Sequence, residues 1–468
     1  MFVRTFHVFG NNSRFIVHLT LLCFIFTVKP NIGIEREKLH VQGTLDAVDI
    51  NAIEIEANYT GPKLEDGKIT LNFMNDLVEF FRGSSLESKQ WSVLHRKYTF
   101  LILRQIRDYF KIQPSLIELK LPTNGKITVC GDIHGNLEDL LHIFDMNGLP
   151  SPENYYLFNG NFVNRQPLSV ECALIYFGYK LLYPGAFFIN RGNHEDIKES
   201  LKQYGLAEEI QTKYPENEKI LHGFWEVFQW LPLAHLISAK IAVKSEDTSS
   251  CQKENFIGKY IDKGHRFYKK ILNKWLNPFN WSGACAPTHG RVLVIHGGLP
   301  SKGNVTLEDI KQIKRGCDAL DAGHTSLMFD ILWSDPGRLD GVHQNKLRYA
   351  SIQFGPNVTE SFCERNKIDF IIRSHIALPD GYHVEHNGRI VTVFSTANHH
   401  TENPGAIVVL ESSSLEPRFT TFARGTYLKQ CNTTGRVFTL TRWSDKKNIR
   451  VGRYWTSSAD PTRGGQRG

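Results

Sequence analysis

The sequence predicts an α/β layered domain over about residues 58–423. Short apolar runs, typical of buried strands, each end in a cluster of polar residues. Segments in which apolar residues recur at helical spacing lie between these runs. Hydrophobic residues make up 41% of the 468 residues, which is enough for a large core and too little for a protein with many membrane spans.

The predicted strands share one feature, a polar cluster directly after the last apolar residue. They cover residues 126–130, 155–158, 187–189, 292–295, 370–372 and 390–394, with helices expected at 137–147 and 168–183. In sheets whose strands are connected by helices, ligands bind at the carboxyl ends of the strands. We therefore expect these clusters, which contain Asp, Asn, His and Arg, to meet at one polar site.

Three segments depart from this pattern. We expect an N-terminal extension at residues 1–42, an insertion at about 238–288 within a main domain at 43–423, and a basic, disordered tail at 424–468. The net charge of +7 belongs to the tail, since residues 421–468 hold ten Lys or Arg against two Asp. The body of the chain is near neutral, so nucleic-acid binding is not expected.

The sequence gives two conflicting indications of the compartment. The eight Cys form no Cys-x-x-Cys pair, which is typical of free thiols in a reducing compartment. The apolar segment Phe15–Val28 instead resembles a signal-peptide core, although no clear cleavage site follows it. A secretory or membrane-anchored location is therefore the alternative to a cytoplasmic one.

The polar clusters contain residue types that bind divalent cations. Asp132 and His134 lie two residues apart after a predicted strand, so their side chains point to the same side. Further candidates after other strands are Asn193, His194, His296 and His375. Four His and one Asp exceed the needs of one ion, so we expect two metals that share a water made acidic by both.

Arginines accompany the same clusters. Guanidinium groups match the oxygens of phosphate two at a time, so arginines beside metals predict a phosphoryl substrate. The arginines concerned are Arg165, Arg191, Arg348 and Arg373.

Five motifs, in this order, resemble the phosphoprotein phosphatase family of Ser/Thr phosphatases. They are GDIHG at 131–135, RGNHE at 191–195, HGGL at 296–299, WSDP at 333–336 and RSH at 373–375. Within the family the chain is most similar to the catalytic domain of the protein phosphatase 5 branch. The resemblance implies a calcineurin-like metallophosphoesterase fold, a central β-sandwich flanked by helices, so that residues 43–423 would be the phosphatase domain.

The resemblance also implies roles for single residues. The family binds two divalent ions (Mn, Fe or Zn), and hydroxide bound to them attacks the phosphate in line. His194 would be the general acid, oriented from position 164. Matching metal ligands are Asp132, His134, Asn161, Asn193, His296 and His375, and matching substrate-binding residues are Arg165, Asn193, Arg348 and His399.

One loop departs from the family pattern. The family motif GDxVDRG reads GNFVNRQ at 160–166, so that Asn161 stands at the position of the carboxylate that bridges the metals. An amide offers one neutral oxygen, and its NH₂ cannot bind a cation, so we expect weak occupancy of the second site. Asn164 replaces the acid that pairs with His194, and His399 replaces a Tyr of the phosphate site.

Two functions remain open from the sequence. The first is a phosphatase that hydrolyses phosphoserine and phosphothreonine with reduced activity, and the second is a pseudophosphatase that binds a phosphoprotein without hydrolysing it. The resemblance implies a cytoplasmic or nuclear location. Residues 1–42 are too short for three repeats of about 34 residues, so we expect no tetratricopeptide region and no chaperone docking through one.

Overall fold

A computed structural model of the chain describes residues 43–84, 91–241, 287–319, 321–399, 402–423, 426–430 and 437–441. The expected N-terminal extension, with its segment Phe15–Val28, lies outside the described residues, as do most of the expected insertion and most of the tail. In the part of the chain that the structure describes, no helix has the length and apolar character needed to cross a membrane.

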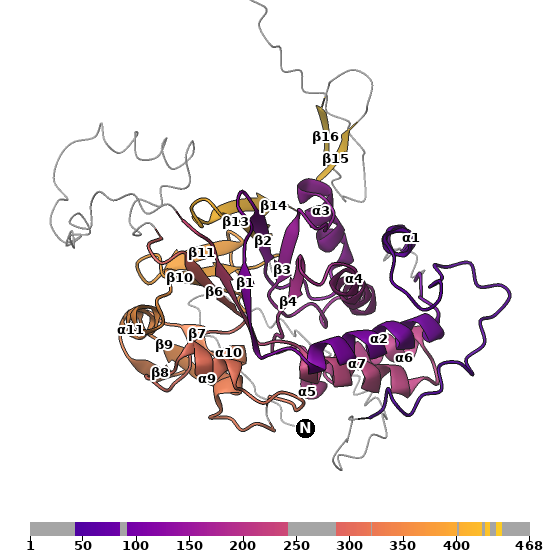
Figure 1. Ribbon diagram of the computed structural model, residues 1–468, viewed down its shortest axis with the longest axis horizontal. Coiled ribbons are helices and arrows are strands. Elements are labelled where there is room, and N and C mark those ends of the chain that lie inside the picture. The colour runs from indigo at the N-terminus through magenta and orange to yellow at the C-terminus, as the bar shows by residue number, and fades with distance from the viewer. Residues whose placement is uncertain are drawn as a thin grey trace, which may run out of the picture. The chain divides into compact units, whose positions relative to one another are not determined.

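Two β-sheets form the centre of the molecule (Figure 1). The first has the order β14-β13-β2-β3-β4, with β2, β3 and β4 parallel. Its strands are β14 (Arg418–Phe422), β13 (Gly405–Glu411), β2 (Lys126–Cys130), β3 (Tyr155–Phe158) and β4 (Phe187–Ile189).

The second sheet has the order β1-β5-β6-β10-β12-β11, with β6, β10 and β12 parallel. Its strands are β1 (Leu116–Lys120), β5 (Ala234–Ser238), β6 (Arg291–Ile295), β10 (Phe370–Arg373), β12 (Ile390–Val393) and β11 (Tyr382–Glu385).

The two sheets pack face to face through alternate residues of their strands. Ile127 and Val129 of β2 share one buried apolar cluster with Val292 and Val294 of β6. Thr128, between them, lies on the other face and bonds to Asn147 of a covering helix. This period of two is what a pleated strand imposes, and it confirms the predicted β-sandwich.

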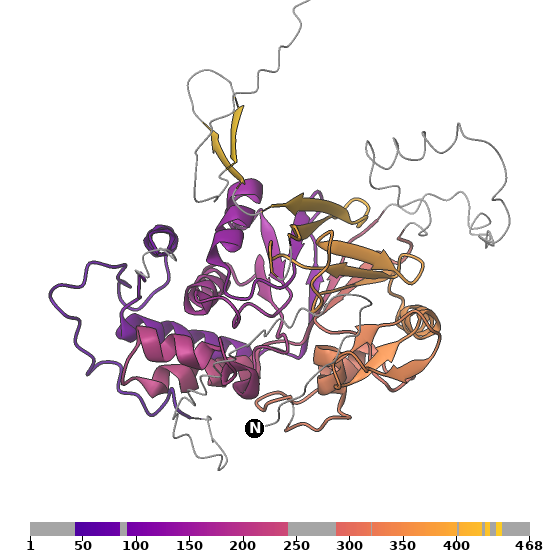
Figure 2. The ribbon, with the colours of Figure 1, turned by 180° about the vertical axis from the view of Figure 1, so that it is seen from behind.

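Helices cover the outer faces of both sheets (Figures 1 and 2). Against β3 lie α3 (Leu137–Asn147) and α4 (Ser169–Leu182), whose aromatic side chains pack on Tyr156 and Phe158. On the other sheet, α10 (Leu327–Trp333) and α11 (Pro356–Asn366) share an apolar cluster with β6 and β10. The remaining helices of the described residues are α1 (Leu71–Arg82), α2 (Arg96–Lys111), α5 (Ile197–Ser200), α6 (Leu206–Lys213), α7 (Glu218–Trp230) and α9 (Leu307–Lys311).

Two small sheets complete the described structure. The first contains β7 (Asp335–Pro336), β9 (Ile352–Phe354) and β8 (Val342–Gln344). The second is the antiparallel pair β15 (Thr426–Gln430) and β16 (Val437–Thr441), which falls in the segment that the sequence predicted to be disordered. The disorder expected for residues 424–468 stays a prediction.

Candidate functional site

The loops after the parallel strands meet at one edge of the sandwich. Directly after β2 and β12, an isolated parallel bridge pairs Asp132 with Phe394 and thereby joins the two sheets. The backbone of these loops is sharply bent, since non-glycine residues with positive φ are uncommon and concentrate at functional sites. They include His134 (φ 49°), Asn161 (52°), Asn164 (68°), Arg165 (78°) and His375 (73°).

Asp132 lies at the centre of this edge and is 1% exposed. Its Oδ1 accepts a hydrogen bond from the backbone N–H of His375 at 3.1 Å, and its Oδ2 lies 3.3 Å from Nε2 of His134. Burial alone would raise the pKa of Asp132, but hydrogen bonds with His134 and Asn161 lower it to about 2. The side chain is therefore a carboxylate at neutral pH.

Asn161 connects Asp132 to Asn193 through its amide group. Its Nδ2 donates to Oδ2 of Asp132 at 2.9 Å and to Oδ1 of Asn193 at 3.1 Å. Its Oδ1 accepts from the backbone N–H of His194 at 2.9 Å. Both the NH₂ group and the oxygen of the Asn161 amide are thus hydrogen-bonded to protein groups.

His296 and Asn193 face each other with two acceptor atoms. Nδ1 of His296 lies 2.7 Å from the carbonyl oxygen of Asn159, which can only accept, so the ring proton sits on Nδ1. Burial lowers the pKa of His296 to about 4, so the ring is neutral and Nε2 carries a lone pair. That Nε2 lies 3.0 Å from Oδ1 of Asn193.

These atoms fit one divalent cation. Among the described residues, Nε2 of His375 is buried without a hydrogen-bond partner, and its ring centroid lies 5.1 Å from that of His296. An unpaired imidazole nitrogen beside two facing acceptors is the donor set that a cation such as Mn, Fe or Zn satisfies. His375, His296 and Asn193 would hold it.

The residues do not fit a second cation. Asp132 and His134 remain at that position, but the NH₂ of Asn161 already bonds to the oxygen that Asp132 would offer.

His194 is oriented by Asn164. The Nδ2 of Asn164 lies 3.1 Å from Nδ1 of His194 and donates to the backbone oxygen of His194 at 3.1 Å. The Oδ1 of Asn164 accepts from the backbone N–H of Leu206 at 2.8 Å. Since an NH₂ group can only donate, Nδ1 of His194 accepts and the ring proton sits on Nε2.

Burial lowers the pKa of His194 well below its usual value, and the positive charge of Arg165 adds to the effect. Asn164 has no charge to offset it. His194 is therefore a neutral hydrogen-bond donor.

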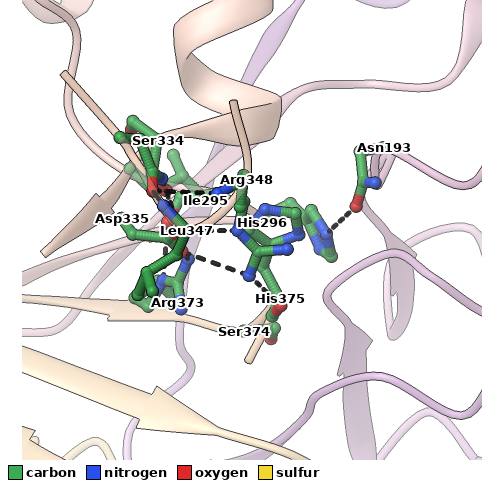
Figure 3. A network of polar contacts seen from close by, with 12 residues as sticks. Asn193, Ile295, His296, Ser334, Asp335, Leu347, Arg348, Arg373, Ser374 and His375 are labelled. Atoms are coloured by element: carbon green, nitrogen blue, oxygen red, sulfur yellow. Dashed lines mark hydrogen bonds and ion pairs between the residues drawn. The ribbon is translucent and has the colours of Figure 1, made fainter. Parts of the chain in front are cut away.

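Two of the predicted arginines, Arg348 and Arg373, lie beside Asp335 (Figure 3). Arg348 donates through Nε to Asp335 at 2.5 Å and through Nη2 to the backbone oxygen of His375 at 2.6 Å. Arg373, fully buried, also donates to Asp335, at 2.8 Å. The side chain of Arg165 is instead exposed, and its backbone N–H donates to Tyr204. A role of Arg165 and Arg348 in phosphate binding stays a prediction.

His399 lies against the metal-ligand candidates. Its ring stacks on that of His134 with centroids 5.0 Å apart and an interplanar angle of 19°. The ring of His134 also meets that of His194 edge-on, at 4.7 Å. Three imidazoles thus lie together on the Asp132 side of the site.

Sequence reasoning assigned no role to two acidic residues of the site. Glu195 is fully buried and accepts the backbone N–H groups of Asn161, Phe162 and Gly192, which joins two of the loops. Asp335 joins the two arginines described above. Both lie in the motifs RGNHE and WSDP, so the signal was present, but one sequence does not reveal hydrogen bonds to backbone N–H groups.

Comparison with protein-family models defines the class of protein. A family described as calcineurin-like phosphoesterase matches residues 125–262 and 254–379, which include the loops after β2, β3, β4, β6 and β10. The chain therefore belongs to the calcineurin-like phosphoesterase family, and the predicted fold is confirmed.

Known proteins specify the branch. Serine/threonine-protein phosphatase 5 of Rattus norvegicus is 40% identical over 386 residues, covering 82% of this chain and 64% of the relative. Serine/threonine-protein phosphatase T of Aspergillus oryzae is 37% identical and covers 77% of this chain and 63% of the relative. The chain thus spans less than two thirds of the length of these curated relatives.

A solved structure agrees with this placement. It is a protein serine/threonine phosphatase from Saccharomyces cerevisiae with similarity to the human phosphatase PP5. The match has a TM-score of 0.58 and 28% sequence identity, and it covers 75% of this chain and 96% of that one. The chain is therefore similar to Ser/Thr phosphatases in both sequence and fold.

One prediction about partners is wrong. A family model described as PPP5 TPR repeat region matches residues 32–118. We expected no tetratricopeptide region and no docking through one, because only residues 1–42 were counted as available for repeats. The matched segment continues through residues assigned to the phosphatase domain, including α1 and α2. The number of residues available for repeats was therefore underestimated.

Proposed function

We propose that the chain is a Ser/Thr phosphatase domain that binds phosphorylated Ser or Thr side chains and hydrolyses them slowly. Membership of the family supports phosphoester chemistry with divalent metal, and a divalent ion held by Asn193, His296 and His375 would polarise the phosphoryl group. The replacement of two acids by Asn161 and Asn164 supports the reduced rate. A cytoplasmic or nuclear location remains a prediction from the resemblance.

The observation that carries the proposal is the hydrogen bond from Asn164 to Nδ1 of His194. A general acid must carry a proton that it can lose without becoming strongly basic, so a histidine acid needs both ring nitrogens protonated. Here an NH₂ group points at Nδ1, where a second proton would have to sit. His194 can therefore donate a hydrogen bond from Nε2 to a phosphate, but it is a poor proton source for the leaving alkoxide.

Asn164 cannot correct this by turning its amide. If the amide turned, its NH₂ group would face the backbone N–H of Leu206, which now donates to Oδ1. The hydrogen bond from Nδ2 to the backbone oxygen of His194 would also be lost. Leaving buried donors unpaired is unfavourable. The amide orientation that prevents protonation of His194 is thus held by two neighbouring backbone groups.

A pseudophosphatase is the second candidate. It is favoured by Asn161, whose amide is satisfied by Asp132, Asn193 and His194 and competes with a cation for Asp132. In that case the exposed guanidinium of Arg165 and the Nε2–H of His194 would capture a phosphorylated side chain without cleaving it.

The first test compares turnover. With the full chain in Mn²⁺, p-nitrophenyl phosphate and a phosphoserine peptide should be hydrolysed about 10²–10⁴-fold more slowly than by the Asn161→Asp/Asn164→Asp double variant, the range that acid–base catalysis contributes. Asn164→Asp alone should recover part of the rate. Equal rates for the natural chain and the double variant would contradict the impairment.

Binding separates the two candidates. Fluorescence anisotropy should detect the phosphoserine peptide on the natural chain and not its unphosphorylated form, and Arg165→Ala should weaken that binding. If the natural chain binds the phosphopeptide and neither it nor the double variant hydrolyses it, the pseudophosphatase is the correct reading. If the natural chain fails to distinguish the two peptides, both candidates fail.

A further inference from the structure

We propose that the carboxamide of Asn161 takes the place of one of the two cations of the family, so that the chain holds a single divalent ion at Asn193, His296 and His375. This deepens the proposed function and rests on it, because both take these loops to be the phosphoryl site. The test of this inference measures bound metal and not hydrolysis.

The amide occupies the position where charge would be needed between two oxygen ligands. Its Nδ2 lies 2.9 Å from Oδ2 of Asp132 and 3.1 Å from Oδ1 of Asn193, and it donates to both. All three side chains are at most 3% exposed, so bulk water has little access to these oxygens. The polarised N–H groups thus hold together two ligands that a cation would otherwise hold.

The backbone fixes the amide in this orientation. A turned amide would place its oxygen against Oδ2 of Asp132, an acceptor against an acceptor. It would also place its NH₂ against the backbone N–H of His194, which now donates to Oδ1 at 2.9 Å. A carboxylate in the same position could accept from His194 with one oxygen and bind a cation with the other, which is why Asp and Asn differ so sharply here.

Close packing leaves the loop no room to shift away. Gly192 lies against Asn161, and a Cβ at that position would collide with the Asn161 side chain and with Glu195. The backbone N–H of Asn161 itself donates to Glu195 at 2.8 Å. The position of the amide is therefore set from both sides.

The other cation position remains available. The carbonyl oxygen of Asn193 has two lone pairs, and the NH₂ of Asn161 uses one of them. The other faces Nε2 of His296 at 3.0 Å, and Nδ1 of the same ring lies 2.7 Å from the carbonyl oxygen of Asn159. Nε2 of His375 is buried without a partner among the described residues. One cation would satisfy all three atoms.

Charge favours the same stoichiometry. Of the six predicted ligands, Asp132 alone is an acid. One divalent ion beside one carboxylate leaves a net charge of one unit, whereas two would leave three units at a buried site.

The test counts bound Mn²⁺ on the full chain by equilibrium dialysis with elemental analysis, in the absence of phosphate. The natural chain should bind one ion, and Asn161→Asp should bind two. Asn164→Asp is the matched control, since it adds an equally buried carboxylate to the same loop that contacts His194 and neither Asp132 nor Asn193; it should still bind one. Two ions on the natural chain, none on it, or only one on Asn161→Asp would each overturn the proposal.

Thermal unfolding provides a second readout that requires no added cation. In EDTA, Asn161→Asp should melt at a lower temperature than the natural chain, because two carboxylates then lie together, and Mn²⁺ should restore it. If that variant does not fold, Asn161→Ala decides: it should lose stability in EDTA because Asp132 and Asn193 lose their shared donor. An alanine variant as stable in EDTA as the natural chain would show that the amide does not act in place of a cation.

Because neither readout involves a phosphate ester, the two proposals can fail separately. A chain that binds one Mn²⁺ yet hydrolyses phosphopeptides as fast as the double variant would refute the proposed function and leave this inference standing. A chain that binds two ions and hydrolyses slowly would do the reverse.

Discussion

The replacement of Asp by Asn changes the direction of a hydrogen bond as well as a charge. Behind His194, a carboxylate would accept from an Nδ1–H group, whereas the amide of Asn164 donates to Nδ1. The tautomer of a buried imidazole follows from the partner of its other nitrogen. A single residue three positions from Asn161 thus decides which nitrogen of His194 bears its proton.

This predicts a spectroscopic difference that does not depend on activity. In long-range ¹H–¹⁵N spectra at neutral pH, His194 of the natural chain should show protonated Nε2 and unprotonated Nδ1. Asn164→Asp should shift the proton to Nδ1, and His194→Gln would identify the signals by their loss. An Nδ1–H tautomer in the natural chain would contradict the hydrogen-bond direction and with it the explanation for slow hydrolysis.

Sequence reasoning reached the identity of these residues but not their orientation. The motif GNFVNRQ at 160–166 revealed both amides, because they could be compared with a known pattern. The orientation of the Asn164 amide depends on backbone groups of His194 and Leu206. Leu206 lies 42 residues from Asn164 in sequence. For the same reason, the sequence motifs did not reveal that Arg348 pairs with Asp335.

At the scale of elements, the short apolar runs that end in polar clusters were predicted with accurate bounds, whereas the buried strands β5 and β13 were not predicted. The predicted strands and helices at 126–130, 155–158, 187–189 and 137–147 have the bounds of β2, β3, β4 and α3. Each is a compact apolar or amphipathic run bounded by Gly, Asn or Pro. The strands of the sheet β7-β9-β8 were not predicted, because their residues are mostly exposed or half-buried and β8 is exposed throughout. Nothing in such a run distinguishes it from a loop.

The short strand β7 nevertheless connects the small sheet to the site. Asp335 in β7 is 3% exposed and bonds to Arg373 at the end of β10 and to Arg348, which in turn bonds to the backbone of His375. Burial alone would raise the pKa of Asp335, but the charges of the two arginines lower it below its usual 3.8. An acid whose pKa is lowered on folding stabilises the fold above its unfolded pKa, and this contribution is lost as the pH falls through its folded pKa.

We therefore expect Asp335→Asn to lower the free energy of unfolding by about 3–5 kcal/mol at pH 7, the cost of leaving buried cations unpaired. The difference from the natural chain should be constant between pH 7 and pH 5 and shrink below about pH 3.8, where Asp335 becomes protonated first in the unfolded chain and, at lower pH, in the folded chain. Urea denaturation at several pH values measures it, with the exposed Glu360→Gln as control. A pH-independent difference would mean that the arginines do not set the ionisation of Asp335.

At the scale of the molecule, a buried ionic cluster attaches the first described residues to the helices. Glu226 of α7 is fully buried and accepts the backbone N–H groups of Gly43 and Leu45. It also pairs with Arg107 of α2 at 2.9 Å, and Arg107 reaches Asp46 at 2.6 Å. One carboxylate thus binds two helices and a chain segment that lies 181 residues from it in sequence.

Glu226→Gln should loosen this attachment selectively, because an amide presents only one acceptor to partners that all donate. The expected loss is about 3–5 kcal/mol in the free energy of local opening of this attachment, since the charge of Arg107 is then incompletely paired. Hydrogen exchange followed by mass spectrometry should show faster exchange at Gly43 and Leu45, while the amides of β2 and β3 exchange as before. Glu216→Gln, an exposed change just before α7, should alter neither quantity. Uniformly faster exchange across the sandwich would instead mean that Glu226 supports the whole fold, and that the residues matched by the TPR-region model are not held as a separable unit.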